Sequence, residues 1–191
     1  MELEPDLGED AHKWGKECLA CNGSPSQCGG SSLPGLRCDP DQPNCIKVSI
    51  TAAFEQDTNQ IMIKSCSNSS TCPGSAIFSN GQHPVTYSAH HECCTGTHCN
   101  TGYFTDTDAG SENGLECYSQ WSPQSVTTMK CRGDMTHCID LIGDSPGNIL
   151  MSGCATESFC QGLYPHISVP GWRNTTCCSE SLCNHGNTTN L

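Results

Sequence analysis

Eighteen cysteines are the residues of this 191-residue chain with the most evident chemistry. Cysteine can bind a metal, act as a nucleophile or form disulfides. One Cys in about every eleven residues is the density of small proteins stabilised by disulfides, which persist only in an oxidising compartment. We therefore expect an extracellular protein, either secreted or held at the cell surface.

The spacing of the cysteines repeats along the chain. A Cys-Cys-x4-Cys-Asn stretch occurs at 93–100 and again at 177–184, and two upstream spacings also repeat, Cys66 to Cys72 as Cys154 to Cys160 and Cys38 to Cys45 as Cys131 to Cys138. Two tandem modules are the simplest interpretation. We expect an acidic leader (1–16), a module with ten Cys (17–100), a linker (101–115), a module with eight Cys (116–184) and a tail (185–191).

Zinc is the alternative use of the cysteines. The pair Cys18 and Cys21, together with the His90-His91-Glu92-Cys93 cluster, has the residue types of a zinc site. The second module, however, lacks counterparts of Cys21 and Cys28 and keeps the other spacings. Loss of two Cys together is expected if they are bonded to each other, whereas a zinc quartet would keep only half of its ligands. We expect disulfides, no metal and no other cofactor.

The eight histidines could support acid–base catalysis. The chain has no Gly-x-Ser-x-Gly, His-Glu-x-x-His or phosphate-binding glycine loop. His98 follows a Cys pair, as the catalytic His of secreted phospholipases does, but Cys99 stands where such an enzyme has Asp, and Leu182 occupies the repeat position. We interpret His98 as a solvent-facing loop residue and expect no catalytic residues and no enzyme activity.

Charge excludes two classes of partner. Lys and Arg number 8 against 20 Asp and Glu, which gives a net charge of −12 and no basic surface for nucleic acid or anionic lipid. Acceptor sequons for N-glycans begin at Asn22, Asn68, Asn174 and Asn187 and favour export. Arg132-Gly133-Asp134 is an integrin-type tripeptide, although such short motifs also arise by chance, so an integrin is a weak partner hypothesis.

Alternating apolar residues predict short β-strands, at 46–50, 61–63 and 85–87 in the first module and at 139–141 and 149–151 in the second. Between them we expect extended loops, because turn-forming residues are frequent at 54–59, 75–84, 143–147 and 161–171. Modules this small with few apolar residues need their disulfides, each of which contributes about 3 kcal/mol by constraining the unfolded chain.

The order of the cysteines, closed by Asn100 and by Asn184, resembles the module of the lymphocyte-antigen and urokinase-receptor (LU) family. This resemblance implies an all-β, disulfide-rich fold of two tandem three-finger domains. It also implies the bridges Cys18–Cys45, Cys21–Cys28, Cys38–Cys66, Cys72–Cys93 and Cys94–Cys99 in the first module, and Cys117–Cys138, Cys131–Cys154, Cys160–Cys177 and Cys178–Cys183 in the second.

Two branches of this family are similar to the chain. The stretches at 113–119, 131–133 and 153–156 resemble the last two modules of the urokinase-receptor type, which implies a cell-surface receptor or adhesion protein with a lipid (GPI) anchor. The two-module layout and the missing Cys pair are also similar to the gamma-type inhibitors of secreted phospholipases, which implies a soluble inhibitor. Both branches imply protein binding rather than catalysis.

Finger loops on a cross-linked hub are the expected binding elements. Their apolar and aromatic residues are the candidate contacts: Phe54, Phe78 and Tyr87 in the first module, and Tyr164, Ile167, Val169 and Trp172 in the second. We expect Tyr87 to pack on the sheet and favour the last finger of the second module, with Trp172 and Tyr164 as contacts; packing at the joint between the modules is the alternative for Trp172. The predicted partner is an extracellular protein, favoured to be basic because this chain is acidic, and gripped by both modules.

Overall fold

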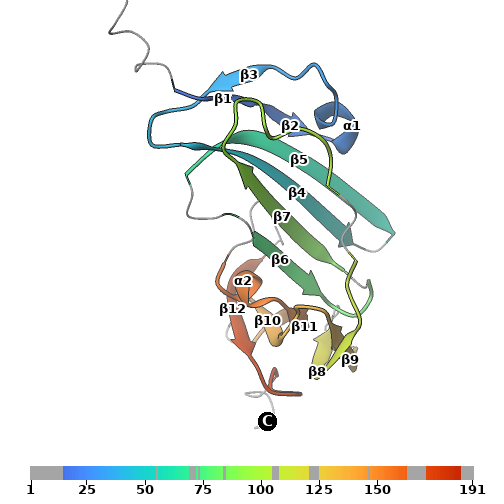
Figure 1. Ribbon diagram of the computed structural model, residues 1–191. Coiled ribbons are helices and arrows are strands. Elements are labelled where there is room, and N and C mark those ends of the chain that lie inside the picture. The colour runs from blue at the N-terminus through green and yellow to red at the C-terminus, as the bar shows by residue number, and fades with distance from the viewer. Residues whose placement is uncertain are drawn as a thin grey trace, which may run out of the picture. The chain divides into compact units, whose positions relative to one another are not determined.

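The computed structural model describes residues 15–54, 56–68, 72, 74–83, 85–104, 108–120, 125–145, 147–162 and 171–185 (Figure 1). Backbone contacts divide the chain into two compact units. Unit 1 comprises Met1–Val48, Ile61–Pro73 and His91–Tyr103, and unit 2 comprises Ser49–Gln60, Gly74–His90 and Phe104–Leu191. Unit 2 thus contains the second sequence module together with the ends of two hairpins from the first.

Unit 1 is built on short strands and one turn of helix. Strands β1 (Glu17–Leu19) and β3 (Gly35–Arg37) form an antiparallel pair. Strand β2 (Cys21–Gly23) pairs with β5, and the helix α1 (Pro25–Cys28) begins at the capping residue Ser24, whose side chain accepts from the Gln27 backbone N–H. Strands β4 (Asn44–Phe54), β5 (Asp57–Ser67) and β7 (Tyr87–Cys94) pass through both units, and unit 1 has the strand order β7-β4-β5-β2.

Unit 2 has the strand order β12-β10-β11-β6-β7, with β8 pairing with both β11 and β9. The remaining elements are β6 (Gly74–Ser79), β8 (Glu112–Gln120), β9 (Val126–Arg132), β10 (His137–Gly143), β11 (Ile149–Ala155), α2 (Glu157–Cys160) and β12 (Trp172–Cys178). In the central strand β10, Ile139 and Leu141 are fully buried, as the alternation of apolar residues requires.

Strand β6, from the first sequence module, pairs with β11, from the second, inside unit 2. Phe78 lies opposite Ala155 and Ser79 lies opposite Cys154 in an antiparallel ladder. The strands approach closely at Gly153, where a Cβ atom would lie 1.9 Å from the carbonyl oxygen of Ser79. Glycine is therefore the residue that this contact accepts.

Three aromatic rings form part of the core beside this ladder. Phe159 of α2 stacks on Phe78 with ring centroids 5.5 Å apart, and it meets Tyr87 edge-on at 5.6 Å. All three side chains are almost completely buried. Thr156, which caps α2, accepts from the Ile77 backbone N–H through Oγ1 at 3.0 Å. Residues about 80 positions apart in the sequence thus share one core.

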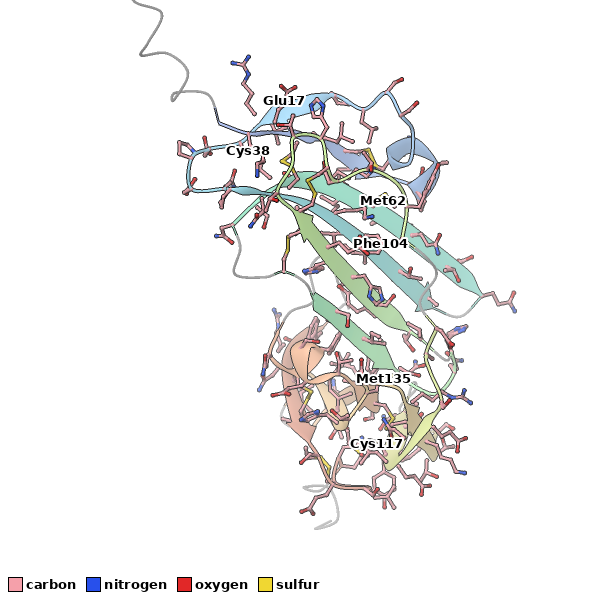
Figure 2. All side chains as sticks on the ribbon, viewed as in Figure 1. Glu17, Cys38, Met62, Phe104, Cys117 and Met135 are labelled. Carbon is pink, nitrogen blue, oxygen red and sulfur yellow. A yellow bond between two sulfur atoms is a disulfide. The ribbon has the colours of Figure 1, made fainter. Side chains whose placement is uncertain are left out.

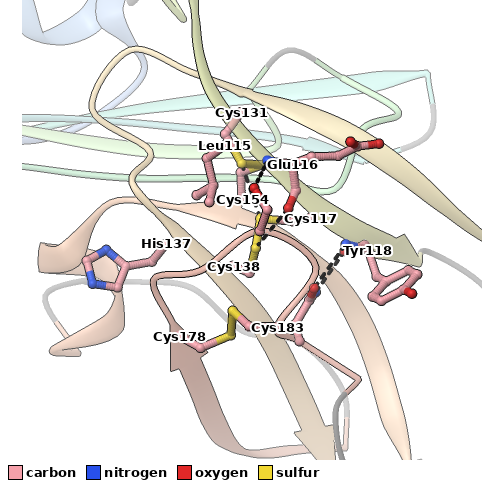
Figure 3. Close-up of a disulfide and its surroundings, with 12 residues drawn as sticks. Leu115, Glu116, Cys117, Tyr118, Cys131, His137, Cys138, Cys154, Cys178 and Cys183 are labelled. Carbon is pink, nitrogen blue, oxygen red and sulfur yellow. Dashed lines mark hydrogen bonds between the residues drawn. A yellow bond between two sulfur atoms is a disulfide. The ribbon is translucent and has the colours of Figure 1, made fainter. Parts of the chain in front are cut away.

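All 18 cysteines are paired in nine disulfides. Figure 2 draws disulfides as yellow bonds between sulfur atoms. The bridges are Cys18–Cys45, Cys21–Cys28, Cys38–Cys66, Cys72–Cys93, Cys94–Cys99, Cys117–Cys138, Cys131–Cys154, Cys160–Cys177 and Cys178–Cys183. They are the same pairs that the family resemblance implies. Figure 3 shows the bridge between Cys117 and Cys138, with Cys131 and Cys154 beside it.

The asparagine that closes each repeat holds the end of its module to two strands. Asn100 accepts from Leu19 N–H at 3.0 Å and donates to the carbonyls of Leu19 and Ile46, both at 2.9 Å. Asn184 makes the equivalent bonds, accepting from Tyr118 N–H at 2.9 Å and donating to the Tyr118 carbonyl at 2.8 Å. Both side chains are buried, so the repeated Asn is explained by the backbone groups to which it bonds.

The prediction of an all-β, disulfide-rich fold is confirmed, and the strands expected at 46–50, 61–63, 139–141 and 149–151 are present. The strand expected at 85–87 is largely wrong, because β7 begins only at Tyr87. The extended loops expected over 54–59 and 75–84 are largely wrong, because β4 continues to Phe54, β5 begins at Asp57 and β6 covers Gly74–Ser79. Pairing with neighbouring strands overrides the turn preference of these residues. The structure also shows β8 beginning at Glu112, inside the segment that we proposed as linker.

No helix among the described residues is long and apolar enough to cross a membrane.

Candidate functional site

The structure locates only part of the finger proposed for binding. Tyr164, Ile167 and Val169 lie outside the described residues. Trp172 begins β12, where it is partly buried and its indole N–H donates to the Asn174 carbonyl at 2.8 Å. Whether this finger contacts a partner stays a prediction. Of the glycan acceptors, Asn22, Asn68 and Asn174 are exposed, and Asn187 lies outside the described residues.

Two of the aromatic candidates in the first module are not surface residues. Phe78 is 1% exposed and Tyr87 is fully buried, and both pack against Phe159. Interpreting Phe78 as a contact residue is therefore a mistake, since its segment forms a paired strand instead of a projecting loop, whereas the burial of Tyr87 agrees with the expectation that it packs on the sheet. The side chain of Phe54 lies outside the description.

Unit 2 contains a cleft that the sequence analysis did not predict. Its volume is about 560 Å³, and residues at the end of β6, in the loop that follows it, and on or beside β8 and β9 line it: Ser79, Gly81, Gln82, His83, Glu112, Met129, Lys130, Arg132 and Met135. We call it the β8–β9 cleft. Its walls come from both sequence modules, which meet inside this one compact unit.

Hydrogen bonds within the 79–83 loop fix one wall of the cleft. Asn80 is 3% exposed, its N–H donates to Thr86 Oγ1 at 3.0 Å, and its side-chain oxygen accepts from Gln82 N–H at 3.1 Å. Ser79 Oγ donates to the His83 carbonyl at 2.7 Å. Gly81 has φ +82°, a conformation that favours glycine in this tight turn.

The opposite wall is anchored to the same loop. Ser119 of β8 is buried and donates its hydroxyl to the Asn80 carbonyl. The β8–β9 ladder then places Glu112 opposite Arg132 and Cys117 opposite Met129. Both walls are thus held by hydrogen bonds, so a ligand would enter a preformed cleft and lose little conformational entropy on binding.

The charges in the cleft are mixed, with an excess of basic groups. Lys130 Nζ lies 3.4 Å from Glu112, and Arg132 lies beside Glu112 as its ladder partner. His83 Nε2 is buried and has no hydrogen-bond partner among the described residues. Met129 and the buried Met135 supply a flexible, polarisable apolar floor. This combination suits a protein surface that presents an apolar side chain next to a carboxylate.

Comparison with known proteins identifies the module. The family model described as the u-PAR/Ly-6 domain matches residues 14–102 and again 113–186. The chain belongs to the u-PAR/Ly-6 domain family. The prediction of two tandem modules of this family is confirmed, while the exact module boundaries stay a prediction.

Proteins similar to this u-PAR/Ly-6 chain include urokinase receptors and phospholipase A2 inhibitors. The urokinase plasminogen activator surface receptor of Mus musculus is 31% identical over 182 residues, which cover 88% of this chain and 54% of that receptor, and the receptor of Rattus norvegicus matches equally well. The chain therefore spans about half the length of these receptors. A phospholipase A2 inhibitor of the gamma type from Gloydius brevicaudus siniticus is 26% identical, with 79% of each chain covered.

Among solved structures, mouse TEX101 aligns with 88% of this chain and 98% of that chain at 14% identity. The TM-score is 0.31, which is too low to show a shared arrangement.

A cluster of Ser, His and Asp side chains lies in unit 2 of this u-PAR/Ly-6 chain, and no motif in the sequence indicated it. Ser152 Oγ donates to Asp140 Oδ1 at 2.6 Å and lies 2.7 Å from His185 Nε2. In a hydrolytic triad the Asp and the Ser contact different ring nitrogens, whereas here Asp140 Oδ1 is 3.5 Å from the same Nε2. Ser152 is also fully buried. The cluster is therefore a structural hydrogen-bond network.

Two residues or motifs singled out in the sequence remain, His98 and the Arg-Gly-Asp tripeptide at 132–134. His98 is exposed at φ +53°, and its backbone N–H donates to the Glu17 carbonyl at 2.9 Å, as Leu182 N–H does to Glu116 in the second module. The tripeptide at 132–134 forms an exposed turn closed by Met135 N–H on the Arg132 carbonyl at 3.1 Å. Of its side chains, that of Arg132 lines the cleft.

Sulfur atoms of Cys18, Cys38 and Cys66 lie close together, as do those of Cys117, Cys131 and Cys154. Each belongs to a disulfide, so none is the thiolate that zinc requires.

Proposed function

We propose that this chain is a non-enzymatic extracellular protein-binding module of the urokinase-receptor type, acting as a receptor, adhesion or ligand-capture protein. The observation that supports this most is the β8–β9 cleft, which has an apolar methionine floor, a charged rim and walls from both sequence modules. A single partner in the cleft would contact both modules, as the sequence predicts. The relatives named as urokinase receptors support the receptor assignment.

Charge gives the partner two expected properties. The net charge of −12 attracts a basic protein at long range and should make the association rate fall as salt is added. In the cleft itself, Lys130 and Arg132 outnumber Glu112, so the inserted segment should carry a carboxylate. A basic protein with an acidic or carboxyl-terminated loop satisfies both conditions.

A soluble inhibitor of secreted phospholipases is the second candidate. The relative that favours it, the gamma-type phospholipase A2 inhibitor, aligns along 79% of its own length, more than the receptors do. A lipid anchor separates the two candidates. Release of the native protein from cells by a phosphatidylinositol-specific phospholipase C would support the receptor, and secretion without such treatment would support the inhibitor.

Binding of two probes to the full chain tests the cleft: urokinase plasminogen activator and a secreted phospholipase A2. We expect one probe to bind, and we expect Arg132→Glu and Met129→Ala to weaken that binding at least tenfold, because both side chains line the cleft. Arg173→Glu makes the same charge change at an exposed residue outside the cleft and should leave the affinity unchanged. Equal effects of the two charge reversals would contradict a specific role for the cleft.

Absence of catalysis is tested on the same preparation. The full chain should not hydrolyse a phospholipid or a peptide ester, and turnover that disappears in His98→Ala would refute the non-enzymatic assignment.

A further inference from the structure

Strand β9 (Val126–Arg132) has one paired edge and one open edge. Among the described strands it pairs with β8 alone (Figure 1). In an antiparallel pair, every second residue of a strand directs its backbone N–H and C=O away from the neighbouring strand. Outside the β8 ladder, no residue of Val126–Lys130 makes a backbone hydrogen bond to a described residue. The outward backbone groups of β9 are therefore open to another strand.

The amino acids along this edge favour strand pairing. Val126 is 51% exposed, and Thr127 and Thr128 are exposed as well. Valine and threonine are common in strands, and no proline and no charged residue interrupts positions 126–129. Native proteins protect exposed edges with charges, prolines or bulges, and this stretch has none of them, since the register irregularity lies at Glu112–Glu116 of β8. An unprotected edge is expected where a partner covers it.

Two hollows lie along β9, and Met129 lines both. One is the β8–β9 cleft of about 560 Å³, which Lys130 and Arg132 also line. The other, which we call the polar hollow, has a volume of about 230 Å³, and its polar lining residues include Asn80, Ser119, Ser125, Thr127 and Thr128. Side chains two residues apart in an extended segment point to the same side, about 7 Å apart. Two hollows that follow each other along one strand suit alternate side chains of a second strand.

The two hollows differ in chemistry. Hydroxyl groups in the polar hollow can both donate and accept, so they suit a hydroxyl side chain. In the cleft, Lys130 is 3.4 Å from Glu112, whereas the exposed Arg132 forms no ion pair with a described residue. A guanidinium binds a carboxylate through two parallel hydrogen bonds. The cleft therefore suits an acidic side chain.

We propose that the partner adds an extended segment to the open edge of β9, with an acidic side chain beside Arg132 in the cleft and a hydroxyl side chain, two residues away, in the polar hollow. This inference rests on the proposed function and specifies how the partner binds. Backbone hydrogen bonds supply affinity, and the two hollows supply sequence preference. A second copy of this chain is a poorer occupant, because each copy carries a net charge of −12 and the copies repel each other.

The test uses NMR of the isotope-labelled full chain and the peptide acetyl-Val-Thr-Val-Asp-Val-Thr-Val-amide. The peptide has Thr two residues from Asp on both sides, so it fits β9 in either strand direction. We expect a dissociation constant below about 1 mM. Amide hydrogen exchange at every second residue of 126–130 should slow at least tenfold on binding. The residues between them, which already bond to β8, should change little and serve as the internal control.

Peptide variants separate backbone from side-chain recognition without altering the protein. Methylating the backbone nitrogens at alternate positions keeps every side chain. Methylation of one alternate set should abolish binding and methylation of the other set should leave it, because only one set faces β9. Replacing the central Asp of the peptide by Lys should weaken binding at least tenfold, and so should Arg132→Glu in the full chain. Arg173→Glu, at an exposed residue outside the cleft, is the matched control and should leave the affinity unchanged.

Binding that survives both methylation patterns would overturn strand addition, and if it still requires Arg132, the cleft remains the binding site and the proposed function is unaffected. No binding of the peptide at about 1 mM would also overturn the inference, while the protein probes test the cleft separately. Slowed exchange in β9 at raised protein concentration, without peptide, would assign the edge to a second copy of the chain and overturn the proposal as well.

Discussion

Asn184 and Asn100 show at the residue scale how one amide can close a small domain. Each lies directly after the last Cys of its module and bonds to backbone groups on two other segments. The disulfide that precedes it constrains the chain but satisfies none of these backbone groups. The amide is therefore needed in addition to the disulfide, because buried donors and acceptors without partners are costly.

Replacing Asn184 by Ala should destabilise the protein by about 2–3 kcal/mol, because the Tyr118 N–H and the Tyr118 and Ile139 carbonyls lose a buried partner. Denaturant unfolding followed by circular dichroism measures the change. Asn148→Ala, at an exposed side chain, is the matched control and should be nearly neutral. If both variants lose the same stability, the repeated Asn has no special structural role.

Lys64 on β5 is the opposite case, a charged group whose burial is unfavourable. It is 2% exposed, and its Nζ has no hydrogen-bond partner among the described residues. Burial lowers the pKa of Lys64, and the positive charge of Lys47 lowers this pKa further. Between the lowered pKa of the folded state and the ordinary Lys value of about 10.4, Lys64 carries a proton in the unfolded chain and has lost it in the folded chain. The free energy of unfolding should therefore rise with pH across this interval.

Lys64→Met should raise the free energy of unfolding at pH 7 by about 1–3 kcal/mol and remove this rise with pH. Chemical denaturation at a series of pH values from 7 to about 10 tests it. Higher pH is avoided because burial raises the pKa of Tyr87, so that the unfolded chain would lose that proton first and stability would fall. If the free energy of unfolding of Lys64→Met rises with pH as much as that of the native protein, groups other than Lys64 cause the rise.

At the element scale, the pairing of β6 with β11 joins residues of the two sequence modules into one unit. The ladder is short, with Ser79 opposite Cys154 and Phe78 opposite Ala155, and the aromatic cluster around Phe159 lies beside it. Packing of these rings contributes more free energy than the few backbone hydrogen bonds, since each buried ring removes a large apolar area from water.

Gly153→Ala tests the closeness of these strands. Its Cβ would lie 1.9 Å from the Ser79 carbonyl oxygen, so the strands must separate, and we expect a loss of about 2–4 kcal/mol, in the range of overpacked sites. Gly30→Ala is the control, because a Cβ there has no atom within 4 Å. Thermal unfolding of the two variants should differ by many degrees, and equal melting temperatures would show that the strands do not approach as closely as described.

At the scale of the whole molecule, the nine disulfides contribute most of what a larger hydrophobic core would supply elsewhere. Loops closed by bridges range from a separation of 5 residues at Cys94–Cys99 to 28 at Cys38–Cys66. Longer loops lose more entropy in the unfolded chain, so bridges such as Cys38–Cys66 should matter more for stability than the short terminal ones.

Non-reducing peptide mapping of the full chain should recover nine bridges, none of which joins a cysteine of residues 17–100 to one of residues 116–184. Thiol titration under denaturing conditions should find no free cysteine. A bridge between these ranges, or stoichiometric zinc in the purified protein, would contradict the disulfide assignment.

Cysteine order, the repeat and the closing Asn pointed to the family from the sequence alone, because such features are local and their spacing survives changes elsewhere. Alternation similarly located strands such as the one around Ile139. The sequence could not show that Phe78 is a core residue, since its partner Phe159 lies more than 70 positions away and its burial depends on the β6–β11 pairing. The β8–β9 cleft was hidden for the same reason: His83 and Lys130 become neighbours only when long-range strand pairing brings their segments together.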